Sequence, residues 1–404
     1  MARFIQHDEF DEQFQRTLAA ATVGCADLGE ALATAERIIP GDLDSWYQEW
    51  RRTGDRISAE AEESLSAGHT LDAADCYLRA SEYYRQAFFF ARDDLDAARL
   101  HDAYGAHRQA FRAALPLLSV DVTAVAIPYQ DISLQGYLCR PDTSATPRPT
   151  VICPAGYDST AEAGYSLSAI AAVRRGMNCL VYEGPGQGGV LYEQRRYFRH
   201  DYEAVLAPVV DWLVTQPGVD VERLVLFGRS FAGYLAARGA TGEHRIAALV
   251  CDPVEYDFAS PLRDRLGDEG WALLEADDPA IDPILDGLLA DPVQRNGFVS
   301  RMATHGTPTL RAYLRELARF SVAGLADRIT CPTLALEAEG DFANLGQLDA
   351  FAAEVAGPVT THRFTAAEGA GGHCEGLGQR RLERLAYEWI TSVLQDDKEV
   401  AAGG

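Results

Sequence analysis

Apolar positions in the first part of the chain, residues 1–118, recur at helical spacing. They fall three or four positions apart, as in Ala73, Tyr77, Ala80, Tyr84 and Phe88. This spacing aligns side chains along one face of a helix. Proline, which interrupts helices, is nearly absent from this stretch. The pattern therefore predicts an all-helical N-terminal domain.

The pattern changes from residue 119 onward, where short apolar runs alternate with helical stretches. These runs have the length and composition of strands: VDVTAVAIPY, DISLQGYLCR, TVICPA, MNCLVYEG, RLVLFG, ALVCDP, TLALEA and VTTHRF. Alternation of strands and helices is typical of a mostly parallel sheet with helices on both faces. We therefore predict an α/β fold around an eight-stranded sheet.

One segment of this second region, residues 257–325, departs from the alternation because it is helical, acidic and strandless. We expect it to be an insertion over the carboxyl edge of the sheet, where ligands bind in open α/β folds. The expected domains are 1–118, a helical roof over the active site, and 119–395, the sheet domain with its insertion. Residues 396–404 are predicted to be a flexible tail.

The stretch RLVLFGRSFAGYLAARGA carries the most specific chemical signal in the chain. An apolar strand runs into the tight turn Gly228-Arg229-Ser230-Phe231-Ala232-Gly233, and a helix of small residues follows. This context is typical of a nucleophile elbow, which holds a serine on a strained strand-to-helix turn. The usual pattern G-x-S-x-G ends here in Ala232. We predict that Ser230 is a nucleophile.

A serine nucleophile on such a fold is followed in the chain first by an acid and then by a histidine. Asp341 follows the strand TLALEA and is the preferred acid, with Glu337 and Glu339 as alternatives. His373 lies in the glycine-rich loop GAGGHCEG beyond the last strand and is the preferred base. His362 falls inside a strand, so a structural role is expected for it.

An oxyanion hole is expected from the backbone N–H groups of Phe231 and Tyr157, in the loop CPAGYDSTAE. Asp158 in that loop is either a helix cap or a residue that holds the loop. Further candidate substrate contacts are Gly156, Asp158, Arg229, Glu255, Tyr84 and Phe88. For the aromatic residues the alternative is packing between the helical domain and the next domain. Glu255 and Asp252, just past the sixth strand, either help in catalysis or are plain strand-end carboxylates. The turn GPGQG at 184–188 lacks the spacing of a phosphate-binding loop, so we interpret it as a tight turn.

The charge and the cysteine content of the chain exclude some classes of binding partner and cofactor. A net charge of -24 argues against nucleic acid, which needs clustered cations, and against anionic membranes. No apolar run has the roughly 18 residues needed to span a bilayer, and the acidic N-terminal segment does not have the pattern of a signal peptide. Eight scattered cysteines without a CxxC pair favour a reducing cytoplasm. No cluster has metal-ligand spacing, so neither a metal nor a cofactor is expected. Cys374, beside His373, is the thiol to test for reactivity.

Several motifs together resemble one subgroup of two-domain α/β-hydrolases. They are the RAS-x-YYR run at 79–85, the G-x-D-S loop at 156–159, the GPGQG turn, the GRS elbow and the GAG-x-HCE loop at 369–375. The subgroup includes 2,6-dihydroxypseudooxynicotine hydrolase, fungal polyketide chain-shortening hydrolases and FrsA-like esterases. The resemblance implies a Ser/Asp/His hydrolase at Ser230, Asp341 and His373, and in several members cleavage of a carbon–carbon bond. A homodimer is a family-level expectation only.

Three functions remain open at this point. The preferred one is a carbon–carbon hydrolase acting on an aromatic or polyketide-derived, β-diketone-like ketone. The second is an esterase, a thioesterase or an acyl-transfer or cyclisation enzyme with the same triad, because a fold is a weak guide to substrate. The third is a binding protein without catalysis, against which the complete set of Ser230, Asp341 and His373 argues.

Overall fold

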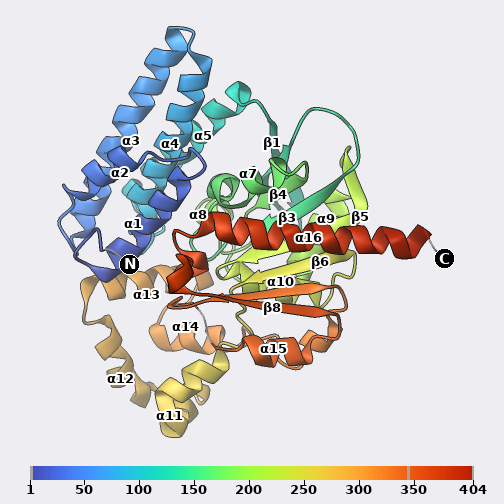
Figure 1. Cartoon of the computed structure of the whole chain (residues 1–404). Coiled ribbons are helices and arrows are strands. Elements are labelled where there is room, and N and C mark those ends of the chain that lie inside the picture. Colours follow the sequence, from blue (N-terminus) through green and yellow to red (C-terminus); the bar gives the residue numbers. More distant parts are fainter. Residues whose placement is uncertain (1–2, 344–345, 403–404) are drawn as a thin grey trace. The chain divides into compact units, whose positions relative to one another are not determined.

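The computed structural model describes residues 3–343 and 346–402 (Figure 1). Side chains are described up to residue 395. The chain forms two compact units. One comprises Met1–Thr123 and Ala280–Tyr313, and the other comprises Ala124–Pro279 and Leu314–Gly404. The predicted insertion therefore contributes residues to both units, and each unit is described by itself below.

The first unit is helical, as the spacing of its apolar residues predicts. Its N-terminal helices are α1 (Asp8–Ala21), α2 (Leu28–Ala35), α3 (Leu43–Ser66), α4 (Thr70–Phe89) and α5 (Ala98–Ala114). The carboxylates of Asp27 and Asp42 accept hydrogen bonds from the first N–H groups of α2 and α3. Such caps satisfy donors that a helix start leaves unpaired.

Aromatic side chains fill the interior of this helical unit. Trp46 and Trp50 are fully buried and pack on each other, and Tyr83 stacks on Trp50 with ring centroids 5.6 Å apart. The unusual aromatic density of α4 thus includes side chains that build the core of the unit. Residues 280–313 join this unit through α12 (Asp282–Asp286) and α13 (Pro292–His305), where Asn296 donates a hydrogen bond to the carbonyl of Phe90.

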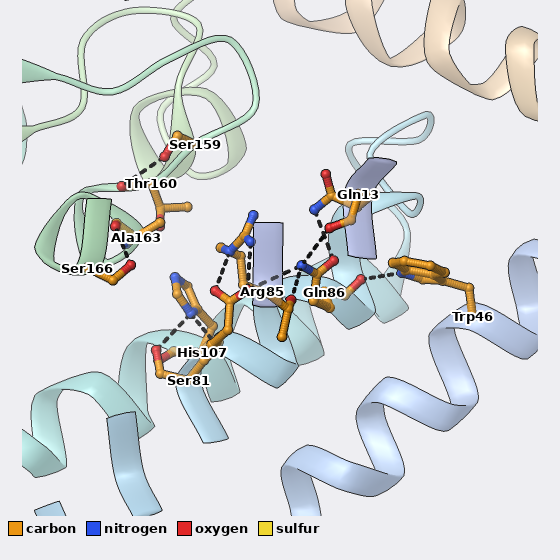
Figure 2. Close-up of polar contacts among 12 residues, drawn as sticks. Gln13, Trp46, Ser81, Arg85, Gln86, His107, Ser159, Thr160, Ala163 and Ser166 are labelled. Carbon is orange, nitrogen blue, oxygen red and sulfur yellow. Dashed lines mark hydrogen bonds and ion pairs between the residues drawn. The ribbon is translucent and has the colours of Figure 1, made fainter. Parts of the chain in front are cut away.

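A polar network is buried within the same unit (Figure 2). The Arg85 guanidinium donates two hydrogen bonds to the Glu82 carboxylate, at 2.7 and 2.8 Å. Glu82 also accepts from the Thr17 hydroxyl, and the Trp46 indole donates to the carbonyl of Gln86. Buried charges are tolerated only when they are paired and hydrogen-bonded. The network meets this condition through contacts between α1, α3 and α4.

The second unit is built on an eight-stranded sheet, in the order β1-β2-β4-β3-β5-β6-β7-β8. The strands are β1 (Asp121–Tyr129), β2 (Ile132–Arg140), β3 (Arg148–Pro154), β4 (Asn178–Tyr182), β5 (Val219–Arg229), β6 (Ile246–Asp252), β7 (Thr333–Ala338) and β8 (Val359–Phe364). β2 pairs antiparallel with β4, and every pairing from β4 to β8 is parallel. This confirms the predicted α/β fold.

Helices follow the strands of this unit, as parallel connections require. They are α6 (Ala161–Gly164), α7 (Ile170–Val173), α8 (Gly188–Tyr192), α9 (Glu203–Leu213), α10 (Ala232–Ala240), α11 (Ala259–Glu275), α15 (Leu348–Glu354) and α16 (Gln379–Ala402). The helix α14 (Leu310–Leu317) begins in the first unit and ends in the second. Within 257–325 the chain is helical, apart from an isolated bridge between Asp257 and Ser321.

The C-terminal part of the chain continues α16 further than expected. The backbone of residues 396–402, predicted to be a tail, extends this helix, and residues 403–404 lie outside the described part. In the described ranges, no helix combines bilayer-spanning length with sufficient hydrophobicity.

Candidate active site

Ser230 lies on the sharp turn between β5 and α10, with a positive φ of 57° that non-glycine residues rarely adopt. Small residues are required around it. A Cβ added to Gly228 would lie 1.9 Å from the carbonyl oxygen of Ala232, and one added to Gly233 would lie 2.1 Å from that of Pro253. Gly233, which lies one position after the last glycine of the usual pattern, therefore leaves room for the backbone that follows β6.

The structure brings the predicted acid, base and nucleophile into one hydrogen-bonded chain. His373 Nε2 lies 2.8 Å from the Ser230 hydroxyl oxygen, and His373 Nδ1 lies 2.8 Å from Asp341 Oδ1. The second oxygen of Asp341 accepts the Cys374 N–H at 3.0 Å. The Asp341 side chain is fully buried and that of His373 is 9% exposed. A buried carboxylate on Nδ1 favours the tautomer whose free Nε2 can take a hydroxyl proton.

The alternative acids have other partners. Glu337 pairs with Arg363, and Glu339 accepts the backbone N–H of Ala366 at 2.8 Å. His362 packs its ring on Phe364, within the same strand. Geometry therefore favours Asp341 as the acid that orients His373.

The predicted oxyanion loop passes close to the nucleophile. A Cβ on Gly156 would lie 3.4 Å from Ser230 Cβ and 3.8 Å from its hydroxyl oxygen. Backbone at this distance can aim N–H groups at an oxygen bound beside Ser230. The neighbouring Tyr157 packs its ring on Phe231, with centroids 4.6 Å apart.

A glutamine of the GPGQG turn supports this loop, a role that the sequence analysis did not assign. The Gln187 amide nitrogen donates to the carbonyls of Ala155 and, at 3.2 Å, of Gly156. Its oxygen accepts the Gly184 N–H at 2.6 Å. Gln187 is 1% exposed. A long polar residue in an otherwise glycine-rich turn was the available signal.

Glu183, one residue before the same turn, is the second support. It is 1% exposed, and its two oxygens accept the N–H groups of Ala161, at 3.0 Å, and Gly189, at 2.7 Å. A Cβ at Gly188 would lie 2.0 Å from the Glu183 carboxylate. The glycine therefore leaves room for a carboxylate that joins the turn to the start of α6.

Arg229, considered above as a substrate contact, is engaged with the protein. Its guanidinium donates to the carbonyls of Leu167 at 2.9 Å and Cys374 at 3.2 Å, to the Gln379 side chain at 2.8 Å and to Asp252 at 3.3 Å. Burial opposes this cation, but the neighbouring Asp252 carboxylate helps to keep its pKa above the usual value. Arg229 thus ties the elbow to the loop that carries His373.

An aromatic cluster adjoins the elbow within the sheet unit. The Phe231 ring contacts those of Tyr157, Phe198, Phe258 and Phe320, at centroid distances from 4.6 to 5.7 Å. Tyr157 and Phe258 are half-buried, whereas Phe231 and Phe320 are buried. These rings make the surroundings of Phe231, the residue after Ser230, largely apolar.

The ring of Phe342 packs on the imidazole of His373, the hydrogen-bond partner of Ser230. Its ring centroid lies 4.5 Å from that of His373, and the residue is 56% exposed. A ring in this position limits the access of water to the imidazole.

The remaining candidates are not joined to this hydrogen-bonded chain. Tyr84 and Phe88 belong to the helical unit, where the Tyr84 hydroxyl donates to Asp55 and Phe88 packs against Tyr104. Asp158 is half-buried in the oxyanion loop, and Glu255 is buried three residues after β6.

Asp341, His373 and Cys374 bring potential metal-ligand atoms within 4.8 Å of one another. The atoms are engaged in other contacts, because both Asp341 oxygens accept hydrogen bonds and His373 Nε2 faces Ser230. Burial raises the pKa of the Cys374 thiol well above its usual value. The neutral thiol is a poor nucleophile and metal ligand.

Strand order, the strained serine turn and the Ser–His–Asp geometry define the α/β-hydrolase class. Comparisons with known proteins agree. The family model described as "Esterase FrsA-like" matches residues 37–259. The chain is 30% identical to hydrolase acrC of Aspergillus aculeatus, over 85% of each chain. It is 32% identical to the 20-hydroxy-prefusarin hydrolase FUS2 of Gibberella moniliformis, over 85% of this chain and 84% of the relative.

The crystal structure of 2,6-dihydroxy-pseudo-oxynicotine hydrolase has the same fold. It is 21% identical, with a TM-score of 0.73 over 93% of this chain and 95% of that one. The protein belongs to the FrsA-like esterase family of α/β-hydrolases, and it is a hydrolase.

Proposed function

We propose that this hydrolase cleaves a carbon–carbon bond in an aromatic or polyketide-derived ketone of the β-diketone type, with Ser230, His373 and Asp341 as its catalytic triad. The observation that carries the proposal is the hydrogen-bonded chain from Ser230 through His373 to Asp341, with both links at 2.8 Å. A nucleophile and base in hydrogen-bond reach, with the base held by a third group, are what covalent catalysis needs.

In the proposed reaction, Ser230 or a water that it activates attacks the substrate carbonyl while His373 Nε2 takes the proton. The N–H groups of Phe231 and Tyr157 stabilise the oxyanion of the tetrahedral intermediate. When the carbon–carbon bond breaks, its electron pair leaves as an enolate, and His373 returns the proton to that fragment. If Ser230 is the attacking atom, a water then hydrolyses the acyl-enzyme by the same route.

The substrate class is supported by the apolar surroundings of the site. Phe231 directly follows the proposed nucleophile, and its ring contacts those of Phe198 and the half-buried Tyr157. Aromatic rings pack well against other rings. The resemblance to carbon–carbon hydrolases implies a ketone substrate, and one relative is named as a 20-hydroxy-prefusarin hydrolase. The proposed substrate is a small molecule. The proposal also includes a cytoplasmic location and a homodimer, and sedimentation tests the homodimer.

The test compares wild type and Ser230→Ala on aryl β-diketones, p-nitrophenyl esters and acyl thioesters, with products identified by mass spectrometry. We expect diketone cleavage that Ser230→Ala abolishes, and that Ser144→Ala, an exposed serine of the same unit, leaves intact. Turnover of esters or thioesters alone, with a burst of product, would contradict the substrate class and favour an esterase. Absence of both turnover and fluorophosphonate labelling would point to a binding protein.

A further inference from the structure

Two carboxyl groups are buried together beside the proposed triad. Asp252 at the end of β6 is 1% exposed, and Glu375, two residues after His373, is fully buried. The Arg229 guanidinium donates both to Asp252 and to the carbonyl of Cys374, the residue before Glu375, and each of the two carboxyl groups acts on the pKa of the other. Two carboxylates repel each other, so such a pair needs a proton between them.

The donors around the pair lead to the same conclusion. Arg229 donates to one oxygen of Asp252. If both groups are counted as carboxylates, Asp252 Oδ1 and both oxygens of Glu375 find no donor within the described residues. Buried polar atoms are seldom left without a partner. A proton retained on either group supplies the donor for a hydrogen bond between the two, which gives partners to two of these three oxygens.

The titratable groups that face the pair are Arg229 from β5, Asp341 from the loop after β7, and His373 and Cys374 beside Glu375. One guanidinium balances one carboxylate, and Asp341 adds further negative charge. Burial is the main cause that raises the pKa of both Asp252 and Glu375. Asp252 raises the pKa of Glu375 further, Asp341 raises that of both groups, and Arg229 opposes both shifts. The singly protonated pair leaves the Arg229–Asp252–Glu375 group electrically neutral.

The pair also connects the elbow to the base. The carbonyl of Asp252 accepts the Ser230 N–H at 2.6 Å. On the other side, the loop around Glu375 is strained, with positive φ at the non-glycine residues Cys374 and Glu375. Strained backbone persists only where surrounding contacts hold it in place.

We propose that Asp252 and Glu375 are positioning residues that share one retained proton and hold the His373 loop in register with Ser230. This inference rests on the proposed roles of Ser230 and His373. Loss of the shared proton would leave Asp252 and Glu375 as two facing anions. Their repulsion would displace the loop and move the His373 imidazole away from Ser230.

The experiment measures the rate at which a fluorophosphonate labels Ser230, as a function of pH, in the full chain. We expect Glu375→Leu to label about 100-fold more slowly, because misplacing a reacting group by about 1 Å costs about that much. Glu375→Gln should restore most of this rate, since its amide donates permanently to Asp252. Its labelling should persist at alkaline pH where the wild type loses activity. Glu388→Gln, an exposed carboxylate of α16, is the matched control.

Three outcomes would overturn the inference. They are wild-type labelling rates in Glu375→Leu, equally slow labelling in Glu375→Gln and Glu375→Leu, or identical alkaline limbs in Glu375→Gln and wild type. If Glu375→Leu does not fold, the comparison of Glu375→Gln with wild type still decides. If the wild type is not labelled at all, the triad fails and the positioning role fails with it. The shared proton can still be tested by thermal unfolding in that case. If the folded protein retains it, the melting temperature of the wild type falls relative to that of Glu375→Gln as pH rises.

Discussion

At the residue scale, the turn around Ser230 requires glycines that leave room for neighbouring backbone atoms. Gly233 has no side chain because the carbonyl of Pro253 occupies the place of a Cβ, at 2.1 Å. Ala232, by contrast, occupies the position where the usual pattern has glycine, and it is fully buried. The last glycine of the motif is therefore displaced by one residue, to the position where the start of α10 meets the backbone of Pro253.

Gly233→Ala should disturb this turn. Its Cβ would force the end of β6 away from α10, and overpacking of this kind costs about 1–3 kcal/mol. We expect a lower melting temperature and slower labelling of Ser230. Gly297→Ala, in a helix where an added Cβ meets nothing within 4 Å, should instead be neutral or stabilising by about 0.5–1 kcal/mol. Equal effects of the two substitutions would contradict this account.

Gln187 offers a second test at this scale. Gln187→Ala removes the donor that holds the carbonyls of Ala155 and Gly156, and leaves a buried loop undersatisfied at a cost of about 1–3 kcal/mol. We expect kcat to fall more than KM rises, since the oxyanion is stabilised mainly in the transition state. Gln216→Ala, which loses hydrogen bonds at the end of α9, is the control. A pure KM effect would show that Gln187 acts on substrate binding.

At the element scale, the helix α4 carries charge into the core of the helical unit. The side chains of Glu82 and Arg85 are 6% and 8% exposed and pair one helical turn apart. Burial opposes ionisation of Glu82, but Arg85 and hydrogen bonds from Thr17 and Gln86 leave its pKa below the usual value.

Arg85→Met should therefore destabilise the protein by about 3–5 kcal/mol, because removing one partner leaves an unpaired buried charge. Its effect on thermal unfolding should shrink in acid, where protonation of Glu82 removes the orphaned charge. Arg52→Met on α3, a cation that is 72% exposed, should change stability by less than about 1 kcal/mol. A small effect of Arg85→Met at neutral pH would contradict the assigned role of the pair.

The elements themselves were largely predictable from the sequence. The eight strands follow from runs of apolar residues, and Ser230, Asp341 and His373 follow from their order after strand ends. Gln187 and the pair Asp252–Glu375 were not assigned, because their partners are backbone carbonyls or side chains more than thirty positions away. Local periodicity contains no information on such contacts, which arise only when parallel strands align their carboxyl ends.

At the scale of the whole molecule, chain order and spatial grouping differ. The predicted insertion 257–325 is helical, yet its middle part belongs to the unit of the N-terminal helices. The apolar spacing of α13 predicts a helix, but it does not specify which other helices cover its apolar face. The hydrogen bond from Asn296 to Phe90 spans 206 positions and illustrates why the grouping needed the structure.

This grouping places His305, at the end of α13, in the interior of the helical unit, where it is 6% exposed and packs on Tyr313. Burial lowers its pKa from 6.5 to about 3. Between these values the unfolded chain binds a proton that the folded chain does not, so stability falls as pH drops below 6.5. From pH 7 to pH 5 the loss is about 2 kcal/mol.

His305→Gln removes this titration while it keeps a polar side chain of similar size. We therefore expect its melting temperature to fall less than that of the wild type between pH 7 and pH 5. His244→Gln, at an exposed position of the sheet unit, measures the effect of losing a surface histidine. The net charge of -24 makes general acid effects large, but these act equally on all three proteins. Parallel curves for His305→Gln and wild type would show that His305 is solvated or protonated in the folded chain.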